Sequence, residues 1–267
     1  MTDTSAPHRV LFGLPIDAIT LSQAVQRCDA AIVGRKEIVV GVVNAAKIVN
    51  LRKDPHLRNS LLDCDMILAD GQSVVWASRF LGRPLPERVA GIELFESLLA
   101  LADRDGRSIY LLGARPEVLT ALIDHIAEHF PGAVIVGSRD GYFEDHEGAE
   151  IARDIADCNP DMLFLGMVSP KKEIFLGTYG RELPVPVMHG VGGSFDVLAG
   201  VTRRAPRSWQ KLGMEWAYRL KQEPGRLWKR YAKTNSRFIA LTLAERFRPS
   251  APLRRPAISE DPEEKDR

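Results

Sequence analysis

SIYLLGARPEVLTALIDHIAEHFPGAVIVGS, residues 108–138, is the stretch that decides the fold of this chain. It opens with a short apolar run that ends in Gly113, continues with helically spaced apolar residues over 116–130, and returns to an apolar run over 133–138. A strand, a helix and a second strand in this order are typical of a βαβ unit, in which both strands lie parallel in one sheet.

The same alternation continues on both sides of this unit. Residues 45–62 have helical spacing, and a further helical pattern follows residue 71. Further apolar runs are EIVVGVV (37–43), MILAD (66–70), DMLFLGM (161–167) and VPVMHGVGG (185–193). Short apolar strands that alternate with helices indicate a largely parallel sheet covered on both faces. We therefore predict a Rossmann-like α/β core over residues 1–200.

The bulk properties are those of a globular protein. The chain has 267 residues, 45% of them hydrophobic, and a net charge of +1, so it is not a general polyanion binder. Its three cysteines, Cys28, Cys64 and Cys158, lack CxxC spacing, which argues against a disulfide framework or a structural zinc site. Neither a signal-peptide pattern nor an apolar run of membrane-spanning length occurs. We expect a cytoplasmic protein, or one attached to a membrane from that side.

The composition changes after residue 200. Over residues 203–237 basic residues far outnumber acidic ones, and three of the four tryptophans lie there. The Pro224-Gly225 pair predicts a break between two helices. We therefore predict a basic helical appendage over 201–248. The tail over 249–267 is rich in proline and charge, which predicts disorder.

Apolar residues recur at helical spacing in the first half of the appendage, at Trp209, Leu212, Trp216 and Leu220. A basic amphipathic helix with tryptophan suits an anionic membrane surface. The alternatives are docking on the core and self-association as a homo-oligomer. We expect no nucleic acid partner, because the aromatic residues lie on the apolar stripe and not among the basic residues. A chain that ends near Gly200 is expected to fold but to lose membrane binding.

Ligands of an open parallel sheet bind beyond the carboxyl ends of its strands. Asn44, Asp70, Gly113 and Gly166 stand at such ends and should gather at one rim. Asp70 closes an apolar strand just before Gly71, and a carboxylate in that place can take a proton from a substrate hydroxyl. The alternative is that Asp70 caps the helix that follows it.

A glycine-rich turn follows the last predicted strand. Backbone N–H groups at Gly192 and Gly193 can approach a diphosphate closely, although a tight strand-to-helix turn explains the same residues. Asp196 can accept hydrogen bonds from a ribose, or can be an early helical acid favoured by the helix dipole.

A second loop, SPKKE (169–173), carries Lys171, Lys172 and Glu173. Lysine is a good phosphate partner, while a solvated charged surface is the alternative. His189 has no histidine or cysteine partner at metal spacing, and no paired carboxylates stand at a strand end, so we expect no metal and no cofactor.

Four blocks together resemble the WecG/TagA/CpsF glycosyltransferases, which form glycosyltransferase family 26. They span residues 44–94, 110–118, 165–175 and 189–231. The last block is the most specific, because it combines GVGGSFD, RAP, QKLGxEW and RLxxEPxRLWxRY in that order.

This resemblance implies an inverting, metal-independent transfer of a sugar from a UDP-sugar to an undecaprenyl-diphosphate-linked acceptor in cell-surface polysaccharide biosynthesis. N-acetylmannosamine is the donor sugar of the best-known members. The resemblance also implies a Rossmann-like fold whose helical appendage meets the inner face of the membrane and completes the active site.

Residue by residue, the family's base falls on Asp70, its substrate-binding asparagine on Asn44, and a functional arginine on Arg88. Arginines that close over the diphosphate match Arg219, Arg226 and Arg230.

Two departures from the family pattern touch substrate contacts. Val42 replaces a threonine, and Lys172 replaces a glutamine. The alternative donors are therefore UDP-glucose and a UDP-uronic acid, used in exopolysaccharide repeat-unit assembly. A nucleotide-dependent oxidoreductase would need a glycine fingerprint that this chain lacks. A more distant alternative is a non-catalytic adaptor recruited to the membrane.

Overall fold

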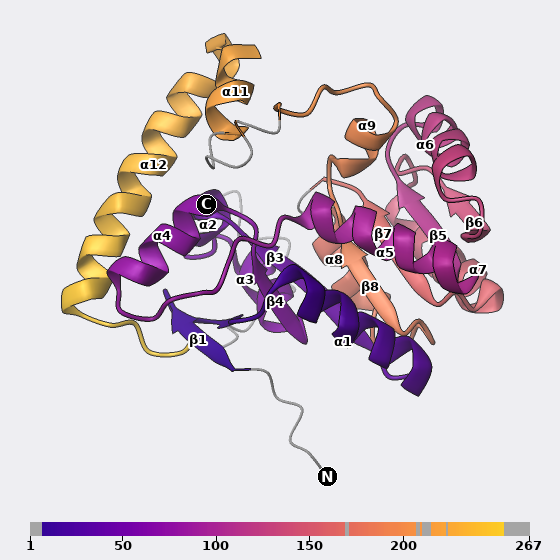
Figure 1. Ribbon diagram of the computed structural model, residues 1–267, viewed down its shortest axis with the longest axis horizontal. Coiled ribbons are helices and arrows are strands. Elements are labelled where there is room, and N and C mark those ends of the chain that lie inside the picture. Colours follow the sequence, from indigo (N-terminus) through magenta and orange to yellow (C-terminus); the bar gives the residue numbers. More distant parts are fainter. Residues whose placement is uncertain (1–6, 169–170, 207–208, 210–214, 223, 254–267) are drawn as a thin grey trace.

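The computed structural model describes residues 7–168, 171–206, 209, 215–222 and 224–253 (Figure 1). Six parallel strands form one sheet in the order β4-β3-β8-β7-β5-β6. Their bounds are β3 (Ile38–Val43), β4 (Met66–Ala69), β5 (Ser108–Gly113), β6 (Val134–Arg139), β7 (Met162–Gly166) and β8 (Val187–Gly190). The predicted Rossmann-like parallel sheet is confirmed.

Helices cover both faces of the sheet. Successive side chains of a strand point to opposite sides, and the strands carry apolar residues on both sides that the helices bury. On β5, Leu111 packs with the helices of one face, α1 (Leu21–Gly34), α5 (Gly91–Asp105), α6 (Pro116–His129) and α9 (Ser194–Leu198). The next residue, Leu112, packs with α7 (Gly148–Cys158) and α8 (Lys171–Tyr179) on the other face. A short 3-10 helix, η1 (Asp145–Glu147), precedes α7.

A third apolar cluster lies at the β4 edge and includes a hairpin that sequence analysis did not predict. The antiparallel strands β1 (His8–Leu11) and β2 (Leu14–Asp17) form this hairpin. An Asp17 carboxylate oxygen accepts a hydrogen bond from the Ile67 N–H at 2.8 Å, which ties the hairpin to β4. Helix α4 (Gln72–Phe80) packs in the same cluster.

The predicted helical stretch over 45–62 forms two helices, α2 (Ala45–Asn50) and α3 (Pro55–Leu62). Asp54 starts the second, because its side chain accepts a hydrogen bond from the Leu57 N–H at 3.0 Å. Pro55 follows at the first helical position, where its missing N–H costs nothing.

Within the part of the chain that the structure describes, two helices follow the sheet domain, and the second begins at Pro224, where a break was predicted. They are α11 (Glu215–Gln222) and α12 (Pro224–Phe247). Helix α12 lies along one side of the molecule beside α2 and α4, and α11 packs near its N-terminal end (Figure 1). No helix within the described residues is both long and apolar enough to cross a bilayer.

The C-terminal half of α12 is anchored in the third cluster. The Phe238 side chain is buried and its ring lies 5.4 Å from that of Phe12, centroid to centroid. Residues 249–253, the start of the stretch that we expected to be disordered, continue along the hairpin instead. The Leu253 N–H donates to the Gly13 carbonyl at 2.9 Å. Residues 254–267 lie outside the described part of the chain.

Candidate active site

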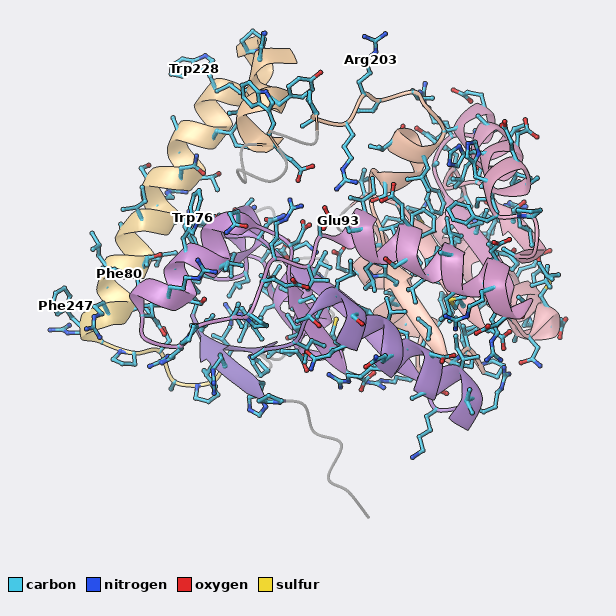
Figure 2. All side chains as sticks on the ribbon, in the orientation of Figure 1. Trp76, Phe80, Glu93, Arg203, Trp228 and Phe247 are labelled. Carbon is cyan, nitrogen blue, oxygen red and sulfur yellow. The ribbon has the colours of Figure 1, made fainter. Side chains whose placement is uncertain are left out.

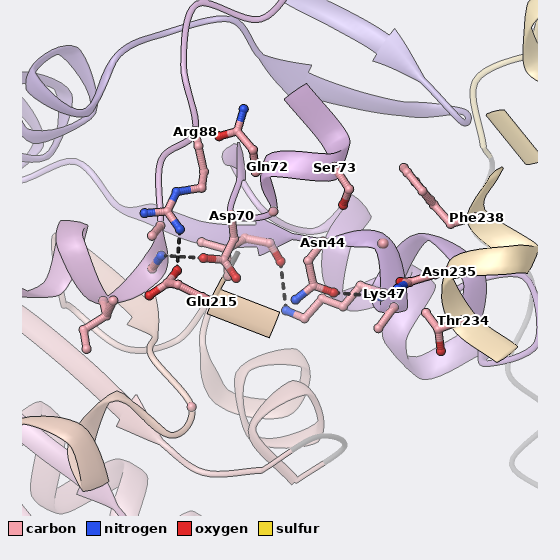
Figure 3. A pocket seen from close by; sticks show the side chains of 18 of the residues that line it. Asn44, Lys47, Asp70, Gln72, Ser73, Arg88, Glu215, Thr234, Asn235 and Phe238 are labelled. Atoms are coloured by element: carbon pink, nitrogen blue, oxygen red, sulfur yellow. Dashed lines mark hydrogen bonds and ion pairs between the residues drawn. The ribbon is translucent and has the colours of Figure 1, made fainter. Parts of the chain in front are cut away.

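A cavity of about 790 Å³ opens beyond the carboxyl ends of β3, β4 and β8 (Figure 3). Asn44, Asp70 and Gly190 come from the strand ends, and α4 and α12 form two of its walls. These strands are neighbours in the sheet, so residues from distant parts of the sequence meet at one edge.

Asp70 lies on the floor of this cavity, directly after β4. Its Oδ1 accepts a hydrogen bond from the Gly91 N–H at 3.1 Å, at the start of α5. The N-cap of the following helix, α4, is Gly71, and no side chain caps that helix. The capping role that spacing suggested for Asp70 is therefore not what the structure shows: the carboxylate faces the positive end of α5 and the cavity.

His189 contacts the backbone of Gly91, the residue whose N–H bonds Asp70. Its Nε2 lies 3.2 Å from the Gly91 carbonyl oxygen and its Nδ1 lies 3.3 Å from that of Val40. The ring is fully buried, and this burial lowers the pKa of His189. His189 is thus a core residue whose ring nitrogens both lie near backbone carbonyl oxygens.

Asn44 and Lys47 form the neighbouring wall (Figure 3). Asn44 caps α2, because its Oδ1 accepts a hydrogen bond from the Lys47 N–H at 3.1 Å. The Lys47 amino group donates to the Val42 carbonyl at 2.9 Å. Burial, and after it the charge of Lys172, lower the pKa of Lys47. Sequence analysis missed Lys47, although its place three residues after a strand-end asparagine puts it one helical turn from the rim.

Lys172 also lines the cavity, and its side chain passes over Gly190. Its amino group lies 3.3 Å from a carboxylate oxygen of Glu173, which is itself buried. Lys172, which stands where the resemblance leads one to expect a glutamine, therefore adds a second amino group to the cavity that Lys47 also lines.

Arg88 belongs to a charge network that links the core to the appendage. Its guanidinium pairs with Glu93 of α5 at 2.7 Å and with Glu215, the first residue of α11. Arg204 pairs with the same two carboxylates, at 2.8 Å and 3.3 Å. Sequence analysis missed Glu215 and Arg204. The available signal was that Glu215 is one of very few acids in a basic segment.

The glycine turn reaches the cavity as predicted from the strand order. Gly192 has a φ of +54°, which favours glycine, and its N–H donates to the Leu165 carbonyl at 3.3 Å. A Cβ added to Gly192 or Gly193 would meet nothing within 4 Å, so this turn borders open space. Asp196, in the helix that follows, does not line the cavity.

Other predicted site residues do not line the cavity either. Gly113 and Gly166 are paired on adjacent strands, and a Cβ on Gly113 would lie 2.6 Å from the Gly166 backbone. These glycines permit close packing. The Lys171 amino group donates to the Gly141 carbonyl at 3.0 Å and so points away from the cavity. Glu173 contributes only through its ion pair with Lys172.

The remaining predictions concern positions that the structure does not describe. The side chains of Arg219, Arg226 and Arg230 lie outside the described part, as do two of the four residues of the apolar stripe, Leu212 and the Trp216 side chain. Among the residues that are described, no three His, Cys, Asp or Glu side chains are grouped to hold a metal ion.

The model of the WecG/TagA/CpsF glycosyl transferase family matches residues 9–252. The chain belongs to this family. Two relatives of this glycosyltransferase are both named N-acetylglucosaminyldiphosphoundecaprenol N-acetyl-beta-D-mannosaminyltransferase. The Bacillus spizizenii protein is 39% identical over a stretch that covers 67% of this chain and 68% of its own length. The Bacillus subtilis protein is 37% identical over a stretch that covers 72% of this chain and 74% of its own length.

Proposed function

We propose that this glycosyltransferase moves a sugar from a UDP-sugar to a polyprenyl-diphosphate-linked sugar, with inversion and without a metal ion. The observation that carries the proposal is the position of Asp70, a carboxylate on the floor of a cavity whose walls carry cations. The names of the two relatives support a lipid-diphosphate acceptor.

In the proposed step Asp70 is the general base. The acceptor hydroxyl oxygen attacks the anomeric carbon of the donor sugar, and the hydroxyl proton passes to the Asp70 carboxylate. The bond from the anomeric carbon to the diphosphate oxygen breaks, and UDP leaves with the electron pair. The hydrogen bond from Gly91 engages Oδ1, which holds the carboxylate in one orientation.

We propose that the basic residues that line the cavity and the turn at Gly192 and Gly193 stabilise the leaving diphosphate. Gly192 and Gly193 border open space, so their backbone can approach a phosphate. Arg88 and Lys172 line the same cavity and carry positive charge that opposes the developing negative charge, and the Lys47 amino group beside them is a hydrogen-bond donor. We propose that Arg219, Arg226 and Arg230 of the appendage add to this charge, and that the appendage contacts the anionic inner face of the membrane.

Asp70→Asn tests the catalytic assignment. We expect transfer to a purified lipid-linked acceptor to fall by about 10²–10⁴-fold, since loss of a general base costs that much. Asp124→Asn is the matched control, because Asp124 is exposed on α6, away from the cavity. Near-wild-type transfer by Asp70→Asn would refute the role of Asp70.

A uronic acid donor is a second candidate, and the pair Lys47 and Lys172 favours it. Both amino groups line the cavity, where a lysine attracts an anionic ligand group, and a glutamine at position 172 would offer no charge. We expect Lys172→Gln to lower the preference for a UDP-uronic acid over UDP-N-acetylmannosamine about tenfold or more, because a hydrogen bond to a charged group contributes about 1.5–3 kcal/mol.

The measurement is UDP release from a panel of UDP-sugars offered with the same acceptor. Lys171→Gln serves as the control, because its amino group is held by the Gly141 carbonyl outside the cavity. An unchanged donor preference in Lys172→Gln would contradict a carboxylate contact at this position.

A further inference from the structure

The two helices that wall the active-site cavity change from polar to apolar in the same direction. On α4, Gln72 and Ser73 lie next to Asp70, and Trp76 and Phe80 follow on the same helical face. These positions are separated by one helical turn each, so they form a continuous stripe.

Helix α12 repeats this order on the opposite wall. Thr234 and Asn235 lie near Asn44 and Lys47 (Figure 3), and Phe238, Ile239 and Leu243 follow along the helix. Thr242 adds no free polar group to the wall, because its hydroxyl donates to the Phe238 carbonyl at 2.8 Å. The cavity is therefore polar at the strand ends and apolar between the outer parts of α4 and α12.

The apolar part of the cavity is open to solvent. Trp76 is 50% exposed and Phe80 51% on α4, and Ile239 is 59% exposed and Leu243 48% on α12. Figure 2 shows Trp76 and Phe80 on the part of the molecule where α4 and α12 run side by side. Four large apolar side chains exposed together on facing walls mark a binding surface and not ordinary surface variation.

We propose that this groove holds the first isoprene units of the lipid-linked acceptor, so that the protein itself, and not only the bilayer, binds the lipid chain. This inference rests on the proposed function. A polyprenyl-diphosphate-linked sugar has the same order of polarity as the walls: a sugar, an anionic diphosphate and an apolar branched chain. The face of α4 from Gln72 to Phe80 rises about 12 Å, at about 1.5 Å per residue.

Continuity with the catalytic cavity favours this occupant over a second copy of the chain or a flat membrane surface. The acceptor hydroxyl must reach Asp70, and the chain attached to its diphosphate then leaves the cavity along one of its walls. The outer stretch of the α4 and α12 walls is apolar, and both end at solvent.

The test uses the full-length enzyme in buffer without detergent or vesicles. Two soluble acceptors are compared, N-acetylglucosamine diphosphate esterified with farnesyl and the same compound esterified with methyl. We expect the wild type to prefer the farnesyl acceptor in kcat/KM, and Trp76→Ala and Leu243→Ala each to lower that preference about tenfold, as expected for loss of a large apolar contact. Ile174→Ala is the control, because Ile174 is 49% exposed on α8 but outside the cavity.

Each other outcome is decisive. Transfer to both acceptors with equal efficiency, or variants that keep the wild-type preference, overturns the inference alone. Absence of transfer to either acceptor overturns the proposed function as well. If the variants keep the preference but lose binding to phosphatidylglycerol vesicles, the groove contacts the bilayer. If they keep it but change the sedimenting mass, the groove binds a second copy. Both of these results also reject a chain-binding groove.

Discussion

At the scale of single residues, the backbone of one residue, Gly91, links two side chains of the site. Gly91 donates its N–H to Asp70 and presents its carbonyl oxygen to His189, so a buried histidine is connected to the proposed base through a single residue. Sequence analysis could assign Asp70 to the strand end and His189 to the core. It could not show that Gly91, twenty-one residues beyond Asp70, lies between them.

The pKa of His189 predicts a pH dependence of stability. Burial lowers this pKa in the folded state, so below about pH 6.5, the ordinary value, the unfolded chain binds more protons than the folded one. Stability is therefore fully present above that pH and falls with acidification, by at most about 1.4 kcal/mol per pH unit from this group. His189→Gln should flatten the dependence of the free energy of unfolding on pH, measured by urea denaturation between pH 5 and 7.5.

His56→Gln is the control for that series, because His56 is exposed on α3. The free energy of unfolding of His56→Gln should change with pH as steeply as that of the wild type. Equal slopes for wild type and His189→Gln would show that the folded protein binds a proton at His189 as readily as the unfolded chain does.

At the scale of elements, ion pairs of Glu215 join α11 to the core beside α5. Glu215 lies between Arg88 and Arg204, and Glu93 of α5 pairs with the same two arginines. The side chains of Arg88 and Arg204 are only 12% and 19% exposed, so solvent screens these pairs less than it screens pairs on the surface.

A double-mutant cycle on Glu215→Gln and Arg204→Met should therefore give a measurable coupling free energy. We expect about 0.5–3 kcal/mol by urea denaturation, the range found for residues in one network. The pair Arg115 and Glu117 lies at 3.1 Å with both side chains at least half exposed, and the same cycle there should give much less coupling. Additive effects at Glu215 and Arg204 would mean that the network does not fix α11.

At the scale of the whole molecule, one face of the C-terminal half of α12, with Phe238 and Glu245, packs into the core. Phe238 packs on Phe12 of the N-terminal hairpin, and the buried Glu245 carboxylate accepts a hydrogen bond from the Phe12 N–H at 3.3 Å. These contacts revise the expectation that a chain ending near Gly200 folds normally, because such a chain would expose the apolar cluster beneath α12.

Phe238→Ala should lower the free energy of unfolding by about 3–5 kcal/mol, the usual cost of deleting a buried phenylalanine side chain. Phe247→Ala is the matched control near the end of the same helix, since Phe247 is 82% exposed and should change stability little. Urea denaturation of both variants measures the difference. Similar stabilities would show that α12 is dispensable for the fold, as the sequence suggested.

The sequence by itself determined the parallel sheet, the strand-end residues Asn44 and Asp70, and the break at Pro224. These features depend on local periodicity and on the rule that strand ends share a rim, which a single sequence displays. Only the tertiary structure decided which rim residues face one cavity. Lys47, Arg204 and Glu215 meet there because strand order and the docking of α12 bring distant segments together, and neither is encoded in the spacing of nearby residues.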